Sequence, residues 1–199
     1  MKVQAKEDTI TAQEYGIAGF PTVVLLDSNG EEIDRILGYR GPEPFIKQIE
    51  NYEAGIGTFL SVLKEFEADP MDVHLNFEVA EKYYGRGDLD DAVTHYERVF
   101  LLDQWNEKGK SDVAIYYIGV THRKDKEYDR AALQFQRMMD TYPNSSLVPD
   151  ALVYKAFVYQ KGERKAEAIA AYESFIETYP DHDDVEWAQK QIAELKGNE

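Results

Sequence analysis

From residue 58 onward, apolar residues recur every three or four positions, which is the spacing of a helix with one buried face. The pattern predicts a helix over 58–67, then pairs of helices separated by short polar turns, and a closing helix over 183–196. The residues before 58 follow a different pattern. Apolar segments at 23–26 and 33–37 flank Asn29-Gly30, and positive φ angles at these two residues predict a tight hairpin of two strands. Pro42 predicts the start of a helix whose apolar face is Phe45, Ile46, Ile49 and Tyr52. We therefore expect a mainly α fold preceded by a small α/β segment.

The predicted helical region contains one pattern three times. A small residue is followed three positions later by an aromatic residue or histidine, and an alanine and a second aromatic residue follow in the next helix. Two helices alone cannot bury their apolar faces, so units of this kind stack on one another into a solenoid. The landmarks are Ala80, Tyr83, Ala92 and Tyr96, then Gly119, His122, Ala131, Phe135 and Pro143, and finally Ala156, Tyr159, Ala168, Tyr172 and Pro180.

The repeated units resemble tetratricopeptide repeats, in which two helices occupy about 34 residues and carry landmarks of this kind. Here the turns between units are longer, because Ala92, Ala131 and Ala168 are 39 and 37 residues apart. The resemblance implies a solenoid of about three repeats over 71–182 and a capping helix over 183–199. It also implies a non-catalytic scaffold that binds a peptide or protein partner.

In tetratricopeptide repeats, the first helix of each pair lines the groove that holds a partner. The resemblance therefore implies a groove with several aromatic side chains, which favours an apolar or extended peptide. The chaperone-binding members of the family hold a C-terminal carboxylate with lysine, arginine and asparagine. This groove offers mainly Arg123 and nearby Lys124, so we do not expect that ligand. The implied partner-binding residues are Phe77, Glu81, Tyr84, Tyr116, Val120, Arg123, Val153, Phe157 and Gln160.

Residues 3–52 resemble the C-terminal half of the thioredoxin fold. The resemblance rests on Tyr15-Gly16-Ile17, on Pro21-Thr22 ahead of the first strand, and on the hairpin and helix that follow. It implies a cis peptide bond at Phe20–Pro21. Pro21 then serves either as a rigid turn or as a contact point for an extended peptide.

The chain does not carry the chemistry of the thioredoxin family. The paired cysteines of that family, with the strands and helices that hold them, would precede Met1, so we expect the natural protein to be longer. The resemblance implies a truncated segment over 1–54 and a connecting helix over 55–70. Truncation would leave strand edges unpaired, and such edges could join two copies in a homodimer.

The composition excludes several classes of function. The sequence has no cysteine, so it forms no disulfide and offers no thiolate for zinc binding or catalysis. With 38 acidic against 22 basic residues, the formal charge of −16 repels phosphate backbones and argues against nucleic acid as a partner. No apolar stretch approaches the roughly 20 residues that cross a bilayer, so we expect no membrane insertion.

Two signals bear on the compartment. The first residues lack the apolar core of a signal peptide, so the chain as written is expected in the cytoplasm. The endings Tyr142-Pro143 and Tyr179-Pro180 are similar to those of the tetratricopeptide repeats in bacterial envelope assembly proteins, including outer-membrane assembly lipoproteins. The bacterial cell envelope or periplasm is therefore the alternative location if the natural chain begins further upstream.

No group of residues indicates catalysis, a cofactor or a metal. The four histidines lie in separate units, and no two have the spacing of a zinc-binding helix. The segment Asp181–Asp184 predicts the start of the closing helix rather than a cation site. Three functions are open, namely a non-enzymatic scaffold, a fragment of a thioredoxin-like thiol-disulfide oxidoreductase whose cysteine-bearing half is missing, and an oligomerisation module. We favour the scaffold.

Overall fold

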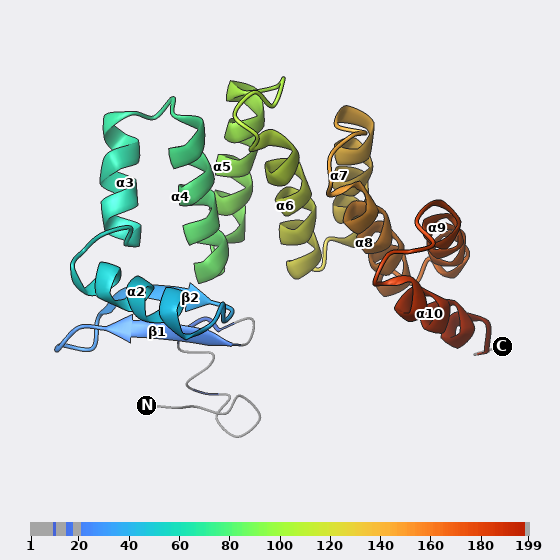
Figure 1. The fold of residues 1–199 in the computed structure, drawn as a ribbon, viewed down its shortest axis with the longest axis horizontal. Helices are drawn as coiled ribbons and strands as arrows, with labels where there is room; N and C mark the ends of the chain where they lie inside the picture. Colours follow the sequence, from blue (N-terminus) through green and yellow to red (C-terminus); the bar gives the residue numbers. More distant parts are fainter. Residues whose placement is uncertain (1–9, 11–14, 18–20, 198–199) are drawn as a thin grey trace. The chain divides into compact units, whose positions relative to one another are not determined.

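The computed structural model describes residues 10, 15–17 and 21–197, and the chain divides into two compact units, Met1–His95 and Tyr96–Glu199. Figure 1 shows a two-stranded sheet followed along the chain by helices, so the predicted fold class is confirmed. The elements are β1 (Thr22–Leu26), β2 (Glu32–Leu37), α2 (Pro42–Glu53), α3 (Phe59–Ala68), α4 (Val73–Arg86), α5 (Leu89–Leu102), α6 (Ser111–Lys124), α7 (Tyr128–Thr141), α8 (Val148–Lys161), α9 (Lys165–Thr178) and α10 (Val185–Gly197).

The two strands and α2 form the N-terminal segment of the first unit. Strands β1 and β2 pair antiparallel, with Thr22 opposite Leu37, and α2 lies against β2. Helix α2 buries Tyr52, but Ile46, which we predicted on the same apolar face, is 56% exposed. The prediction for Ile46 was wrong because the buried stripe follows the helical spacing of positions 45, 49 and 52, and Ile46 lies beside it.

The turn of the hairpin is held by the carboxylate of Asp27. Its Oδ1 accepts the backbone N–H of Asn29 at 2.8 Å and that of Glu31 at 2.9 Å. Gly30 adopts a positive φ of 86°, whereas Asn29 does not. The prediction that both residues take positive φ angles in a tight turn was therefore wrong for Asn29, because Asp27 organises a longer turn.

The second unit alternates between two layers of helices, and each helix from α6 to α10 packs on the next. Helices α6, α8 and α10 form one layer, which we call the A layer. Within it, Tyr116 contacts Tyr154 and Phe157 contacts Trp187, with ring centroids 6.0 and 6.1 Å apart. Helices α7 and α9, with the last turns of α5, form the other layer, which we call the B layer and which is linked by ion pairs.

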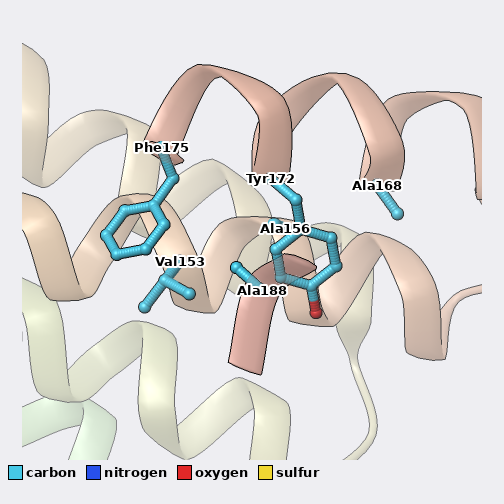
Figure 2. Close-up of a cluster of buried hydrophobic side chains, with 6 residues drawn as sticks. All are labelled: Val153, Ala156, Ala168, Tyr172, Phe175 and Ala188. Carbon is cyan, nitrogen blue, oxygen red and sulfur yellow. The ribbon is translucent and has the colours of Figure 1, made fainter. Parts of the chain in front are cut away.

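The core of the last repeat shows why the landmark residues recur. Figure 2 shows two aromatic rings of α9 lying among small side chains of α8 and α10. The alanines let the three helices approach, and the rings fill the space between them. Both kinds of landmark therefore have the packing role that the repeat pattern predicts. The cluster consists of Val153, Ala156, Ala168, Tyr172, Phe175 and Ala188.

Each helix pair is joined by the same kind of turn. One residue in each turn takes a left-handed φ, which is 88° at Gly87, 64° at Lys126 and 61° at Glu163. The N–H of the following residue then donates to the carbonyl five residues earlier, which closes the first helix in a Schellman arrangement. The accepting carbonyls belong to the landmark residues Tyr83, His122 and Tyr159.

His122 differs from the aromatic residues that occupy its position in the other repeats. Its Nδ1 lies 2.7 Å from Oε2 of Glu127 across the turn. The hydrogen bond with His122 lowers the pKa of the Glu127 carboxyl. An imidazole, unlike a phenyl ring, carries a polar nitrogen that can bind the residue preceding the next helix.

Gly119 provides a direct test of helix approach. A Cβ added there would lie 2.8 Å from Cε1 of Phe135, so Gly119→Ala should lower the free energy of unfolding by about 1–3 kcal/mol. Urea denaturation followed by tryptophan fluorescence measures this, because Trp105 and Trp187 both belong to the second unit. Gly197→Ala is the matched control, since nothing lies within 4 Å of its added Cβ. Equal stability of the two variants would contradict the packing role of Gly119.

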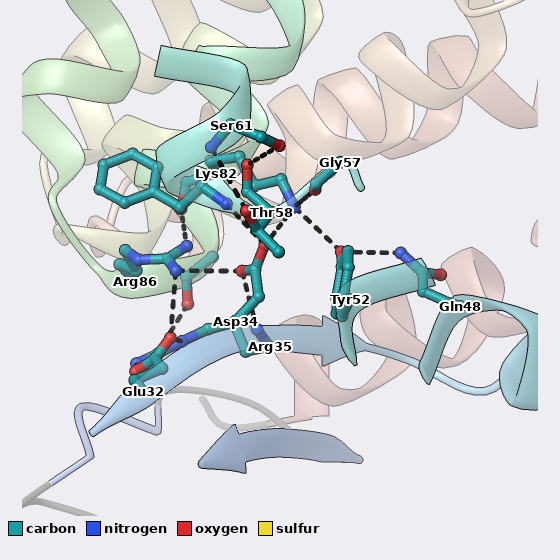
Figure 3. Close-up of polar contacts among 12 residues, drawn as sticks. Glu32, Asp34, Arg35, Gln48, Tyr52, Gly57, Thr58, Ser61, Lys82 and Arg86 are labelled. Carbon is teal, nitrogen blue, oxygen red and sulfur yellow. Dashed lines mark hydrogen bonds and ion pairs between the residues drawn. The ribbon is translucent and has the colours of Figure 1, made fainter. Parts of the chain in front are cut away.

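A buried carboxylate joins three elements of the first unit. Asp34 on β2 is fully buried, and Figure 3 shows its side chain among groups from α3 and α4. Its Oδ2 accepts the backbone N–H of Phe59 at 2.8 Å and lies 2.5 Å from Nζ of Lys82. Its Oδ1 accepts from Arg86 at 3.0 Å. Four groups bind this carboxylate once the backbone N–H of Arg35 is included, so its burial is compensated.

The Asp34 contacts connect the N-terminal segment to the helices that follow it. Phe59 is the first residue of α3, where a negative charge meets the unpaired N–H groups of the helix. Lys82 also donates to the carbonyl of Gly57 at 2.6 Å and to the hydroxyl of Tyr52 at 2.9 Å. The segment predicted over 1–54 thus lies in one compact unit with α3 and α4, and its predicted boundary stays a prediction.

Replacing Asp34 should destabilise the first unit strongly. Asp34→Asn leaves the half-buried ammonium of Lys82 without its carboxylate and leaves Arg86 with Glu32 as its remaining carboxylate, and we expect a loss of about 3–5 kcal/mol. Urea denaturation followed by circular dichroism measures the loss, and hydrogen exchange over 22–86 locates it.

The control for Asp34 is an exposed ion pair. Glu173→Gln breaks the 2.8 Å contact with Lys196, in which both side chains are more than half exposed, and should cost less than about 1 kcal/mol. If both substitutions cost the same, the Asp34 contacts do not hold β2, α3 and α4 together.

Candidate functional site

The A layer carries six of the nine predicted groove residues, three on α6 and three on α8. The structure buries Val120 and Val153, whose side chains serve the packing between helices. The other four residues are partly exposed, and we call the surface that they offer on α6 and α8 the strip. The surface that a partner could touch here therefore comes from Tyr116, Arg123, Phe157 and Gln160.

The remaining three predicted groove residues lie on α4, in the first unit. Phe77 is buried, Tyr84 is half-buried and Glu81 is exposed. Glu81 lines a cavity of about 570 Å³ that also includes Leu37 of β2 and Phe45 of α2. The N-terminal segment thus forms one wall of the space in front of Glu81. Whether these residues bind a partner stays a prediction.

The polar groups of the A layer are held by one another. Gln160 accepts the hydroxyl of Tyr172 at 2.8 Å and donates to Oε1 of Gln191 on α10 at 3.0 Å. Tyr116 is packed between Phe135 and Tyr154, with ring centroids 5.7 and 6.0 Å away. These side chains are therefore fixed before any ligand arrives, which lowers the entropy cost of binding.

The prediction from sequence missed the contribution of α10. Trp187 is 38% exposed and contacts the rings of Phe157 and Tyr172, and Gln191 continues the row of amides. Trp187 and Gln191 follow Val153 and Phe157 by 34 residues, which is the standard repeat length. Extending the repeat by one further unit onto the closing helix would have identified both residues.

Arg123 and Lys161 each lie on an aromatic ring of the A layer. The guanidinium carbon of Arg123 is 5.4 Å from the ring centre of Tyr154, and Nζ of Lys161 is 5.2 Å from that of Phe157. Both residues stand in the last turn of their helix, where the helix dipole favours positive charge. Nε of Arg123 is buried and has no hydrogen-bond partner among the described residues. The strip thus combines aromatic rings, amides and two cations.

The segment that precedes α10 meets a residue of α8. Nε2 of His182 lies 3.7 Å from Oδ1 of Asp150, and Nδ1 lies 3.8 Å from Oδ2 of Asp184. Three such groups can hold a metal ion, but Nδ1 of His182 accepts the backbone N–H of Asp184. A metal-bound histidine normally donates an N–H from its other nitrogen. The contacts of His182 therefore fit the start of α10, as the sequence predicts, and we propose no metal site there.

Pro21 lies just before β1 and is exposed. Its carbonyl accepts the backbone N–H of Gly38 at 2.9 Å, which extends the hairpin by one contact. The cis peptide bond implied at Phe20–Pro21 involves Phe20, which lies outside the described residues. A peptide-binding role for Pro21 stays a prediction.

The phenols of Tyr116 and Tyr172 should ionise at a higher pH than an exposed phenol. Burial raises the pKa of both above its usual value, and for Tyr116 the nearby Tyr154 and Asp150 raise it further. A folded-state pKa above the unfolded value of about 10 gives a contribution to stability that is complete below that pH and is lost as pH rises. An ultraviolet titration of the phenols should therefore show an ionisation step at high pH, and the amplitude of this step should be smaller in Tyr172→Phe. Ionisation of all phenols in one step at ordinary pKa would contradict the burial.

Comparison with family models places two known families on the chain. Residues 2–53 match a thioredoxin-like domain, and residues 108–189 match YfiO, described as an outer membrane lipoprotein. No curated protein matches the chain. The two matches cover the regions in which the sequence resembles thioredoxin and tetratricopeptide repeats, so both resemblances are supported independently.

Solved structures share the helical fold. MamA is 22% identical, with a TM-score of 0.59 over 80% of this chain and 87% of its own. A Podosopora anserina protein of the kinesin light chain type, with nearly identical TPR-like repeats, is 12% identical, with a TM-score of 0.50 over 62% of this chain and 64% of its own. Among the described helices, none has the length and apolar character to cross a bilayer. The chain thus joins a thioredoxin-like segment to a helical solenoid of tetratricopeptide-like repeats.

Proposed function

We propose that the chain is a non-catalytic scaffold that binds a peptide or protein partner through the groove of its repeats. The observation that carries the proposal is the strip of partly exposed aromatic rings along the A layer, formed by Tyr116, Phe157 and Trp187. Partly buried aromatic side chains supply much of the binding energy in protein interfaces, because they offer large apolar area with few rotatable bonds. The repeat fold supports this use of the strip, since solenoids present extended surfaces to their ligands.

An extended peptide fits the strip better than a folded domain. The aromatic rings would pack against apolar side chains of the peptide, and the amides of Gln160 and Gln191 could bond its backbone. The two glutamines already bond each other, and Gln160 bonds Tyr172, so they are positioned for this role. The rings and amides alternate along neighbouring helices, which suits a ligand that crosses α8 and α10.

The cell envelope of a bacterium is the setting that we propose. The match to an outer membrane lipoprotein family covers α6 to α9 and the beginning of α10, which is the part that carries the strip. It agrees with the Tyr-Pro endings at 142–143 and 179–180, which resemble envelope assembly proteins. The cytoplasm is the alternative.

The thioredoxin-like match at residues 2–53 supports a second candidate, a part of a larger thiol-disulfide oxidoreductase. Residues 1–199 contain no cysteine, so they do not supply the thiolates of that reaction. In this alternative the repeats would present substrates to a redox centre located elsewhere. Homodimerisation through the segment over 1–54 also stays a prediction, because the described residues pair β1 with β2 alone.

Selection from a display library of short random peptides tests the scaffold. Phe157→Ala removes a central ring of the strip and should weaken the selected peptides at least tenfold, as is typical of an interface hot spot. Fluorescence anisotropy with synthetic copies of the peptides measures the affinities, and thermal denaturation confirms that the variant is folded.

Leu133→Ala is the matched control for Phe157→Ala. Leu133 is 67% exposed and lies on α7, in the B layer, so its loss should leave the affinities unchanged. Failure of the library to yield any peptide would contradict the scaffold. A larger loss in Leu133→Ala than in Phe157→Ala would move the binding surface to the B layer.

A further inference from the structure

We propose that Arg123 anchors a carboxylate side chain of the peptide that lies along the A layer, with Lys161 as a second cation beside it. The inference rests on the proposed function, and it specifies the ligand as an extended peptide in which an acidic residue is flanked by apolar ones. The inference depends on the half-buried guanidinium of Arg123, which lies on the ring of Tyr154 at the end of the strip.

Arg123 has no acceptor of its own. Within the described part of the chain, its guanidinium makes no hydrogen bond or ion pair, and its Nε is buried without a partner. A buried donor left unpaired is costly, so native structures rarely contain one without a reason. Five other arginines do have a carboxylate partner, in a chain with 38 acidic residues. Arginines paired with carboxylates are Arg35, Arg86, Arg130, Arg137 and Arg164.

The surroundings of Arg123 fix its orientation. The ring of Tyr154 lies 5.4 Å from the guanidinium carbon, and Tyr116 and Phe135 pack against that ring at 6.0 and 5.8 Å. A guanidinium that stacks on a fixed ring keeps its N–H donors available at its edge, in a fork that matches a carboxylate. Because Nε is buried, the terminal nitrogens are the ones that would meet the ligand.

Lys161 adds positive charge at the same end of the A layer. Helices α6 and α8 run in the same direction, because each is followed by an antiparallel partner, and Arg123 and Lys161 stand in their last turns. Nζ of Lys161 lies on the ring of Phe157 and has no ion pair among the described residues. The helix dipole accounts for positive charge in a last turn. It does not account for terminal guanidinium nitrogens that make no hydrogen bond or ion pair among the described residues, whereas an incoming carboxylate would use them.

A side-chain carboxylate suits this site better than a chain terminus. A terminus is held by several cations and amides in neighbouring repeats, and the other groove positions of α6 and α8 hold Tyr116, Val120, Val153, Phe157 and Gln160. A glutamate or aspartate inside the peptide needs only the fork of Arg123. Its apolar neighbours would then pack on Phe157 and Trp187, whose rings contact each other along the strip.

Matched peptides test the inference. Peptides selected from the display library are synthesised in pairs that differ only by Glu→Gln or Asp→Asn, and their affinities for the full chain are measured by anisotropy. The wild-type protein should bind the acidic member about tenfold to a hundredfold more tightly, as expected for hydrogen bonds between charged groups. In Arg123→Met this preference should vanish, and both members should bind equally.

Arg130→Met is the matched control, because Arg130 is an exposed arginine of α7, in the B layer, and should leave the preference unchanged. Arg123→Met should keep its melting temperature, since Nε has no hydrogen bond to lose. Arg123→Lys keeps the charge without the fork and should lose most of the preference. It therefore tests the inference even if the methionine variant does not fold.

The outcomes separate the two proposals. If no peptide binds the wild-type chain, the scaffold proposal fails and the carboxylate anchor fails with it. If peptides bind without preference for the acidic member, or if the preference survives both Arg123→Met and Arg123→Lys, the anchor is overturned while the scaffold stands. Loss of the preference in the Arg123 variants alone supports the anchor.

Discussion

Close approach of helices at positions with almost no side chain is the contact on which the helical unit depends. At Gly119, the ring of Phe135 occupies the space that a Cβ would need, and Ala156 and Ala168 serve the same purpose beside Tyr172. The rings that fill these gaps also touch the A layer, because Phe135 contacts Tyr116, and Tyr172 contacts Trp187. Core and binding strip therefore form one connected set of aromatic side chains, and the packing of the core sets the position of the strip.

Charged groups serve two opposite purposes in the two units. Asp34 is fully buried, and the four donors that surround it use the capacity of its carboxylate, so it acts as a structural joint. Arg123 is half-buried and uses none of its donors within the described residues, so it has hydrogen-bonding capacity for a ligand. Lys161 likewise has no ion pair among the described residues. Their position at one end of the A layer gives the strip a polarity along which a peptide could be oriented.

Local signals were sufficient to predict the helices, because apolar spacing, the Gly87 turn, Pro143 and Pro180 act over a few residues. Contacts between distant residues were not predicted. Nothing near Asp34 in the sequence indicates that it meets Lys82 and Arg86, which are 48 and 52 residues away. The groove residues were predicted from their positions in the resembling family. Position alone does not distinguish a buried valine such as Val153 from an exposed aromatic ring. Trp187 was missed because the repeat was not extended onto the closing helix.

The position along the chain at which the thioredoxin-like match ends differs from the end of the first compact unit. The thioredoxin-like match ends at residue 53, whereas the unit extends to His95. Asp34 stands before the end of the match, and Lys82 and Arg86 stand after it. Recombination at that point would separate a buried anion from its cations, so the three positions are expected to be inherited together. A thioredoxin-like segment from another protein could not replace this one unless α4 changed with it, which makes the fusion of the two folds difficult to reverse.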